Sequence, residues 1–360
     1  MLSTARRKLY RSVRFKTWFR KTNYYHRKIR GIDQVIARFR TPEQLCDREY
    51  VRQLKRDMVR CLLKYGAYFD EYFLFDFEGK DDAYRASFIT EGIRMSFYPR
   101  MNTPRGTSFL EDKYATYKKF KDYFGREMLC LRAHRETSCQ ELAEFTHFVS
   151  SHDKFVIKPT YAAFGKGFRI ASLSDFPSAE QAYEELHGEG VVLEELIVQD
   201  ARMAALHPQS VNTLRVPTAL IKDEHGAPRV VLFHPTLRVG QGESLVDNTS
   251  AGGLSCLIDG ESGVLLTDAA DKLGKRCVAH PDTGVVFRGF QIPEWDQVKR
   301  IVTEAALMMP TEHYIGWDLA LCQDKGWCMV EANSNAQMSG MQFVPREGRR
   351  WELEALIAKM

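Results

Sequence analysis

Acidic and amide residues stand inside two runs of strand-forming residues in the segment YIGWDLALCQDKGWCMVEANSNAQ, residues 314–337. Asp318 lies in the first run, and Glu331 and Asn333 lie two residues apart in the second run. The turn-forming letters QDKG separate the two runs, so the segment predicts a β-hairpin. Side chains of this kind are unusual inside apolar strands, and they indicate a functional site.

The register of this hairpin decides what the three side chains can do. If the loop centres between Asp324 and Lys325, paired positions sum to 649, which sets Asp318 opposite Glu331 and Asn333 on the same face. A three-residue loop would break this register. Two facing carboxylates destabilise a hairpin unless a cation or a shared proton compensates, so three converging oxygen ligands indicate a Mg²⁺ site that shares its shell with phosphates. The alternative is a pair of edge acids that point to solvent.

A second segment, FVIKPTYAAFGKGFRI, has the composition of a phosphate-binding loop. Lys158 ends a short apolar strand, and the loop after it contains Gly165, Lys166 and Gly167. Glycine permits close backbone approach to a phosphate, and a lysine on the neighbouring strand reaches it as a point charge. Neither GxxxxGK[ST] nor GxGxxG is present, so a surface hairpin loop is the alternative.

Downstream, the segment VVLEELI ends an apolar strand in Glu194 and Glu195. Backbone groups at such a strand end can bind an adenine edge, and a carboxylate can hold an amino or ribose hydroxyl group. A solvated strand end is the alternative.

Two arginines lie inside predicted strands and need acceptors. Arg215 lies in SVNTLRVPTALI, and Arg238 precedes the polar, turn-like segment VDNTSAGGL, which contains Asp247 and Asn248. A planar guanidinium binds a carboxylate or phosphate through two hydrogen bonds, so both arginines are candidates for nucleotide phosphates and for an acyl phosphate or substrate carboxylate. Structural salt bridges are the competing interpretation.

The elements that must position these residues follow from hydrophobic spacing. Residues 41–84 have apolar positions at helical spacing, and the segment after Asn102 opens with turn chemistry and continues as a helix that ends near Gly125. Short apolar runs then predict strands, with helices at 178–187 and 294–309. The chain is therefore expected to be an α+β protein with a basic arm (1–40), a helical region (41–104), an α+β domain (105–345) and a C-terminal helix (346–360).

The chain of 360 residues, 44% of them hydrophobic, is long enough to bury a large core, and no apolar run has the length of a membrane span. The net charge is only +4, yet the first thirty residues contain no acid and many Arg and Lys among aromatic residues. An apolar stripe of Leu9, Val13, Trp18 and Phe19 opposite the charges favours peripheral contact with an anionic membrane over specific nucleic-acid binding. A solvated basic helix is the alternative. The expected location is the cytoplasm, at or near the inner membrane face.

Other classes of enzyme lose support. The ten histidines form no HExxH motif or Cys/His cluster, and no GxSxG precedes a plausible triad. His234, inside the run VVLFHPTLRV, is expected to be a core histidine with its hydrogen bonds satisfied.

Taken in order, these features resemble the ATP-grasp superfamily, and within it the sugar-transfer-associated ATP-grasp proteins. The phrases that carry the resemblance are VIKPTYAAFGKG, LEELIVQD, SVNTLRV, VDNTSAGGL and IGWDLAL…MVEANSN, over about residues 105–345. The resemblance implies an ATP-grasp fold in which two α+β subdomains clasp ATP. It also implies that Lys113 and Lys158 contact the phosphates, that Glu194, Glu195, Leu196 and Ile197 line the adenine pocket, and that Asp318, Glu331 and Asn333 bind Mg²⁺.

One departure limits the resemblance. Many ATP-grasp ligases continue the metal-binding ExN with Pro-Gly, whereas this chain continues with SNAQMSG, so the substrate contacts of that loop are not carried over. The implied reaction is ATP-dependent activation of a carboxylate as an acyl phosphate, which an amine attacks to form an amide. The family name suggests a sugar- or amino-acid-containing substrate and a role in polysaccharide biosynthesis. A phosphotransferase that uses the same nucleotide site, and a noncatalytic adaptor that binds membrane or nucleic acid, remain alternatives.

Overall fold

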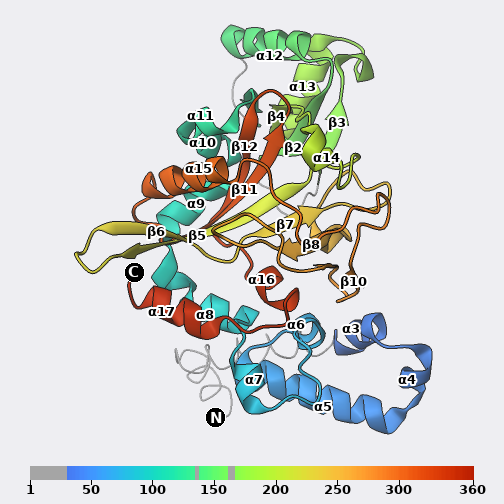
Figure 1. The fold of residues 1–360 in the computed structure, drawn as a ribbon. Helices are drawn as coiled ribbons and strands as arrows, with labels where there is room; N and C mark the ends of the chain where they lie inside the picture. Colours follow the sequence, from blue (N-terminus) through green and yellow to red (C-terminus); the bar gives the residue numbers. More distant parts are fainter. Residues whose placement is uncertain (1–30, 134–137, 161–166) are drawn as a thin grey trace, which may run out of the picture.

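The computed structural model describes residues 31–133, 138–160 and 167–360. Most of the predicted basic arm, together with Gly165 and Lys166 of the predicted phosphate loop, therefore lies outside the described residues. Within the described part, two antiparallel sheets with their helices lie above a group of N-terminal helices (Figure 1). The predicted α+β class is confirmed. None of the described helices is long and apolar enough to cross a membrane.

The smaller sheet has the strand order β1-β4-β2-β3. Its strands are β1 (Met128–Leu131), β2 (Phe155–Pro159), β3 (Arg169–Ala171) and β4 (Val191–Glu195), and its helices are α12 (Cys139–Ser151) and α13 (Ala179–Glu189). Phe155 and Ile157 of β2 pack with the helices in one apolar core. Because successive strand residues face opposite sides, Lys158 faces away from those helices. Val192, its partner in β4, belongs to the core of the larger sheet, so this face points toward that sheet.

The larger sheet has the order β10-β9-β8-β7-β5-β11-β12, and β6 pairs with β5. Its strands are β5 (Thr213–Lys222), β6 (Pro228–Leu232), β7 (Thr236–Val239), β8 (Leu254–Leu257), β9 (Ala269–Ala270), β10 (Arg276–Cys277), β11 (Tyr314–Cys322) and β12 (Gly326–Asn333). Leu214, Val216, Leu237 and Trp317 pack in one core with residues of α15 (Trp295–Leu307). The alternate residues of the same strands, which include the predicted site residues, face the other side.

The N-terminal helices pack on one end of the larger sheet. They are α3 (Ile32–Phe39), α4 (Pro42–Cys46), α5 (Arg48–Tyr65), α6 (Phe69–Leu74), α7 (Asp82–Ala86) and α8 (Glu91–Met101). Their apolar core includes Ala270 of β9 and Phe343 of α16 (Gly340–Phe343). The chain ends with α17 (Arg350–Ile357), and short helices α14 (Ala201–Ala204), η1 (Leu173–Asp175) and η2 (Thr249–Ala251) lie in connections. The domain boundaries stay a prediction.

The prediction of one continuous helix that ends near Gly125 is wrong. The segment forms α9 (Pro104–Glu111), α10 (Lys113–Lys119) and α11 (Lys121–Phe124). Asp112 has extended backbone dihedrals, and its carboxylate accepts hydrogen bonds from the backbone N–H groups of Tyr114 and Ala115. This local capping bond competes with helix continuation and starts α10 at Lys113.

The apolar run around His234 is also divided. The structure forms β6 and β7 instead of one strand, because His234 has a positive φ of 50° directly before Pro235. Its ring Nε2 pairs with Glu352 of α17, so its partner is a carboxylate of a distant helix.

Candidate active site

The hairpin of β11 and β12 carries the predicted metal ligands in the predicted register. Asp318 pairs directly with Glu331, and Gly316 pairs with Asn333. The expected turn is wrong, however, because Cys322 pairs with Gly326 and leaves a three-residue loop. A β-bulge beside Asp318 shifts the register by one residue and restores the predicted pairing.

Arg126, which the sequence interpretation missed, holds this bulge from outside the sheet. Its guanidinium donates to the carbonyl oxygens of Met329 at 2.6 Å and Val330 at 3.3 Å. The same buried side chain pairs with Glu194 of the smaller sheet at 2.9 Å. Arg126 therefore connects the two sheets at the point where the hairpin is irregular. Its only signal in the sequence is an arginine between Gly125 and an apolar strand.

Two arginines of the larger sheet bind the carboxylate of Asp318. Arg215, the residue paired with Asp318 in β5, binds both of its oxygens, and Nη2 of Arg238 lies 2.7 Å from Oδ2. Burial alone would raise the pKa of Asp318, but the two guanidinium groups outweigh it and lower this pKa below its usual value. Asp318 is thus ionised, and it orients both predicted catalytic arginines.

Arg238 is fixed from its other side by the loop after β7. Its guanidinium donates to Oγ1 of Thr213 at 2.9 Å, and the Thr213 N–H donates to Oδ2 of Asp247 at 2.9 Å. Asn248 accepts from Arg238 at 3.4 Å. Burial raises the pKa of Asp247, although Arg238 and Thr213 oppose the rise. The polar loop predicted to cover a site therefore supports an arginine in it.

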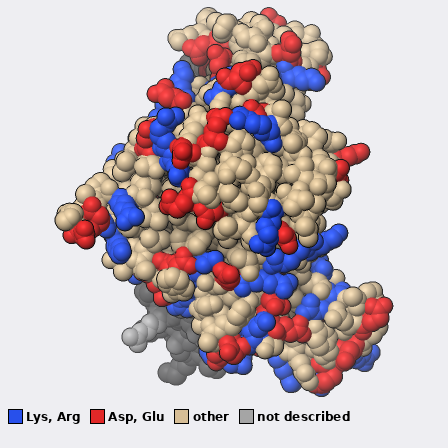
Figure 2. All heavy atoms as spheres, in the orientation of Figure 1, with Lys and Arg blue, Asp and Glu red and all other residues tan. Residues whose placement is uncertain are grey.

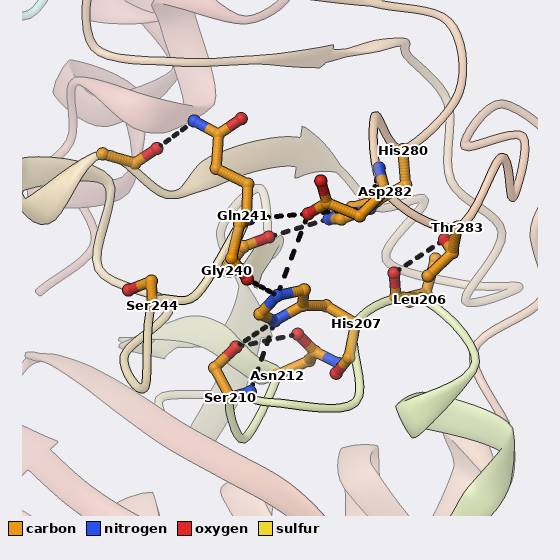
Figure 3. A network of polar contacts seen from close by, with 12 residues as sticks. Leu206, His207, Ser210, Asn212, Gly240, Gln241, Ser244, His280, Asp282 and Thr283 are labelled. Carbon is orange, nitrogen blue, oxygen red and sulfur yellow. Dashed lines mark hydrogen bonds and ion pairs between the residues drawn. The ribbon is translucent and has the colours of Figure 1, made fainter.

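Figure 3 shows how the start of this loop is anchored. The buried rings of His207 and His280 donate through Nε2 to the carbonyl oxygens of Gly242 (2.9 Å) and Gly240 (2.8 Å), respectively. The Gly242 N–H donates to Asp282 at 2.6 Å. Both histidines thus hold the backbone directly after β7, and they act on the loop that supports Arg238.

Glu331 and Asn333 supply the other predicted metal ligands. Among the described residues, no hydrogen bond or ion pair to the Glu331 carboxylate is found, and this side chain is exposed. Protein atoms nevertheless displace much of its water, and together with the facing Asp318 this raises its pKa, while Arg215, Lys158 and Lys113 act against the rise. Asn333 donates to Asp318 at 3.5 Å through Nδ2.

These residues fit a magnesium ion. Carboxylate and amide oxygens are the hard ligands that Mg²⁺ prefers, and Asp318, which pairs with Glu331, raises the pKa of the Glu331 carboxyl, so a cation between the two acids would relieve their repulsion. The described residues contain no group of three His, Cys, Asp or Glu able to hold a metal, so the set depends on the amide of Asn333.

Lys158 projects from the smaller sheet toward this hairpin. Its Nζ lies 2.9 Å from Oε1 of the buried Glu194, which Arg126 also binds. Burial opposes ionisation of Glu194, but the two cations lower its pKa to about 2. Lys113, at the start of α10, has a lowered pKa because of burial, and both Glu331 and Lys158 influence it. The two predicted phosphate-binding lysines and the acid hairpin therefore lie around one site.

Other predicted nucleotide-binding residues lie at its border. Glu195 binds Nζ of Lys325 at 2.6 Å and accepts from the Glu127 N–H at 3.1 Å. Leu196 and Ile197 follow the end of β4 and are half-buried. Gly167 has a φ of +77°, and an added Cβ would lie 2.7 Å from the ring of Pro159, so this position requires glycine.

Two α+β parts, one with Lys158 and the other with the acid–amide hairpin, form the arrangement of a protein of the ATP-grasp superfamily. The chain belongs to the sugar-transfer-associated ATP-grasp family, whose model matches residues 93–357. The predicted family is confirmed.

Solved ATP-grasp ligases have similar folds at low identity. The ligase PsnB is 16% identical with a TM-score of 0.44, and the match covers 72% of this chain and 64% of PsnB. D-alanyl-alanine synthetase A from Vibrio cholerae is 12% identical with a TM-score of 0.43, over 71% of this chain and 66% of that protein. The D-alanine–D-alanine ligase from Coxiella burnetii is 9% identical with a TM-score of 0.41, over 72% and 59% of the two chains.

The chain thus spans just under two thirds of the length of PsnB, which has been solved with a minimal precursor, Mg and ADP. No curated protein matches the chain. The likeness concerns the fold, and no residue role is transferred from these ligases.

Proposed function

We propose that the protein is an ATP-dependent carboxylate–amine ligase that activates a carboxylate as an acyl phosphate and forms an amide. The observation that carries the proposal is the paired acids Asp318 and Glu331 of the hairpin, with Lys113 and Lys158 near enough to act against the raised pKa of Glu331. Two lysines beside carboxylate and amide oxygens can bind the β- and γ-phosphates of ATP together with their metal ion. Membership of an ATP-grasp family supports the nucleotide.

In the proposed reaction, a carboxylate oxygen of the substrate attacks the γ-phosphorus of ATP, and the bond to the β-phosphate oxygen breaks to release ADP. Lys158 and Lys113 stabilise the negative charge on the phosphoryl oxygens during the transfer. An amine then attacks the acyl carbon, loses a proton, and displaces phosphate. Magnesium, held by Glu331, Asn333 and Asp318, would neutralise charge on the phosphates.

The two arginines are proposed to hold the acyl phosphate or the substrate carboxylate. Both guanidinium groups face Asp318, which fixes their planes before substrate arrives. A guanidinium held in this way loses little conformational freedom when it binds a second anion, so pre-organisation favours catalysis.

The substrates are proposed to be a small carboxylate and an amine, one of which contains a sugar or an amino acid, in polysaccharide biosynthesis in the cytoplasm. Contact of the basic arm with an anionic membrane stays a prediction, because residues 1–30 lie outside the described residues. A phosphotransferase that uses the same lysines and acids is the second candidate. The presence of both lysines together with Asp318, Glu331 and Asn333 disfavours a noncatalytic adaptor.

We expect the purified protein to release ADP and phosphate from Mg·ATP when it is given its carboxylate and hydroxylamine. Hydroxylamine replaces the natural amine because an activated acyl group reacts with any good small nucleophile, and the product is a hydroxamate. Screening carboxylate pools by coupled ADP detection, followed by mass spectrometry, measures both products. Formation of AMP would contradict the proposal, and a phosphorylated alcohol without hydroxamate would establish the phosphotransferase instead.

Replacing Glu331 with glutamine is expected to keep the fold and to weaken the Mg²⁺ dependence of nucleotide binding. The change removes one negative charge from the ligand set and leaves its shape, so a higher Mg²⁺ concentration is needed for half-maximal binding. Titrating Mg²⁺ against a fixed ATP analogue by calorimetry measures this directly. Glu224→Gln is the matched control, because that side chain is 86% exposed on a distant turn. An unchanged Mg²⁺ requirement in Glu331→Gln would exclude Glu331 as a ligand.

A further inference from the structure

A second cationic hollow lies where the N-terminal helices meet the larger sheet. It has a volume of about 190 Å³, and it is lined by residues of α3, α6, β9, β10 and α16 and their connections. Figure 2 shows Lys and Arg atoms gathered over this part of the surface, between the sheet and the N-terminal helices. The hollow is too small for a drug-sized ligand, whose sites measure roughly 300 Å³ or more, so it suits a small group.

Three arginines line this hollow, and two of them lack an acidic partner. Arg40 is paired with Glu78. Arg276 donates to the carbonyl of Val344 at 2.5 Å, and no ion pair of Arg276 or Arg346 is found among the described residues. Arg276 and Arg346 therefore line one hollow without an acidic partner among the described residues.

The remaining charged neighbours do not neutralise these two arginines. Asp76 also lines the hollow, but it lies 3.5 Å from Lys80. Asp268 lies 3.6 Å from Arg288, another arginine near Arg276. Burial and the neighbouring Arg346 lower the pKa of Arg276, whereas Asp268 acts against this. Three arginines thus line the hollow against two acids, Glu78 and Asp76, each of which is already paired with another cation, so an anion bound beside Arg276 and Arg346 would reduce their repulsion.

The strained backbone at Arg346 is a second observation that favours a ligand site in this hollow. Arg346 has a φ of 58°, a left-handed conformation that glycine adopts far more readily than arginine. Such strain persists where the surrounding structure imposes it, and it often marks a ligand site. Glycine at this position would serve the turn better, so the arginine side chain has a role other than forming the turn.

The hollow is separate from the candidate active site, although one line of strand residues connects them. Arg238 pairs with Ser255, Ser255 with Ala270, and Ala270 with Arg276. Helix α16 covers the middle of this line, since an added Cβ at Gly340 would lie 3.9 Å from Ser255 Oγ and Phe343 packs in one core with Ala270. An anion at Arg276 thus lies on the far side of α16 from Arg238.

We propose that Arg276 and Arg346, with Arg40 at the border, form a binding site for the phosphate group of a small phosphorylated ligand, distinct from the ATP site. Guanidinium groups match phosphate oxygens through paired hydrogen bonds, and two of them at one hollow can hold both faces of a phosphate or diphosphate. This inference does not depend on the ligase reaction, because none of these arginines belongs to the proposed active site.

Pyrophosphate binding tests the site, measured by calorimetry on the full chain with a saturating, non-hydrolysable Mg·ATP analogue. The analogue removes any pyrophosphate binding at the ATP site from the signal. We expect one remaining site in the wild type, weakened about 10-fold or more in Arg276→Ala and in Arg346→Gly. Arg346→Gly relieves the left-handed strain, so its melting temperature should be equal or higher, which separates lost binding from lost folding.

Arg229→Ala is the matched control, because Arg229 is an exposed arginine of the distant β6. A second arm uses phosphatidylcholine vesicles with and without phosphatidic acid. Pyrophosphate binding that the two variants lose identifies a soluble phosphorylated ligand, and vesicle binding that only they lose identifies a lipid headgroup as the source of the phosphate. Equal binding by wild type and both variants in both arms, or equal loss in Arg229→Ala, would overturn the proposal. If the ATP analogue fails to bind, only the proposed ATP site fails, since the variants are still compared with the wild type.

Discussion

Replacing Lys158 with alanine is expected to lower ADP formation about 10²-fold or more while the fold is retained. In the proposed reaction Lys158 stabilises charge on the transferred phosphoryl group, and removal of one preorganised electrostatic group costs roughly this factor in other enzymes. The buried Glu194 still keeps Arg126 at 2.9 Å in this variant, so its charge remains compensated. Steady-state ADP release and thermal unfolding measure the two expectations.

Lys154→Ala is the control for this variant, because Lys154 is an exposed lysine directly before the same strand. It removes the same charge close by in the sequence without touching the site, and its activity should equal that of the wild type. Normal ADP formation in Lys158→Ala, or an equal loss in Lys154→Ala, would contradict the role of Lys158.

Replacing Arg126 with methionine is expected to lower the free energy of unfolding by about 3–5 kcal/mol at neutral pH. The buried Glu194 loses one of its two cations, and breaking a buried ion pair by removing one partner costs about this much. Glu194 would keep only Lys158, and the carbonyl groups of Met329 and Val330 at the bulge would lose their donor. Urea unfolding followed by circular dichroism measures the loss.

The loss in Arg126→Met should shrink in acid, and the direction follows from Glu194. In the wild type its pKa falls from 4.5 to about 2 on folding, so the stabilisation is present above 4.5 and is lost as the pH falls toward 2. Without Arg126 the folded-state pKa of Glu194 rises toward its usual value, although Lys158 still lowers it, so this contribution becomes smaller. The difference between variant and wild type is therefore largest above 4.5 and decreases below it. A difference that stays constant with pH would show that Glu194 is not the cause, and Arg126→Lys should restore part of the stability.

The sequence predicted the pairing of Asp318 with Glu331, but this prediction rested on a turn that the structure does not form. Alternating apolar residues place both acids on one face, and a one-residue slip would turn a whole strand over, so the burial pattern fixes the register near the acids. The turn-forming residues QDKG alone predicted a loop centred between Asp324 and Lys325, which differs from the three-residue loop of the structure. The bulge that reconciles the three-residue loop with the acid pair is held by Arg126, which is distant in the sequence.

The strand of Lys158, the helical N-terminal region and the family followed from the sequence by itself, because apolar spacing and motif order are local properties. Only the tertiary structure decided that Glu194 binds Lys158 and Arg126, and that Asp318 binds both Arg215 and Arg238. Each of these carboxylates had several possible partners in the sequence. Which cation lies within hydrogen-bond reach of each carboxylate depends on how the two sheets pack. A buried charge without a partner is costly, so the pairing is determined only when folding removes these charges from water.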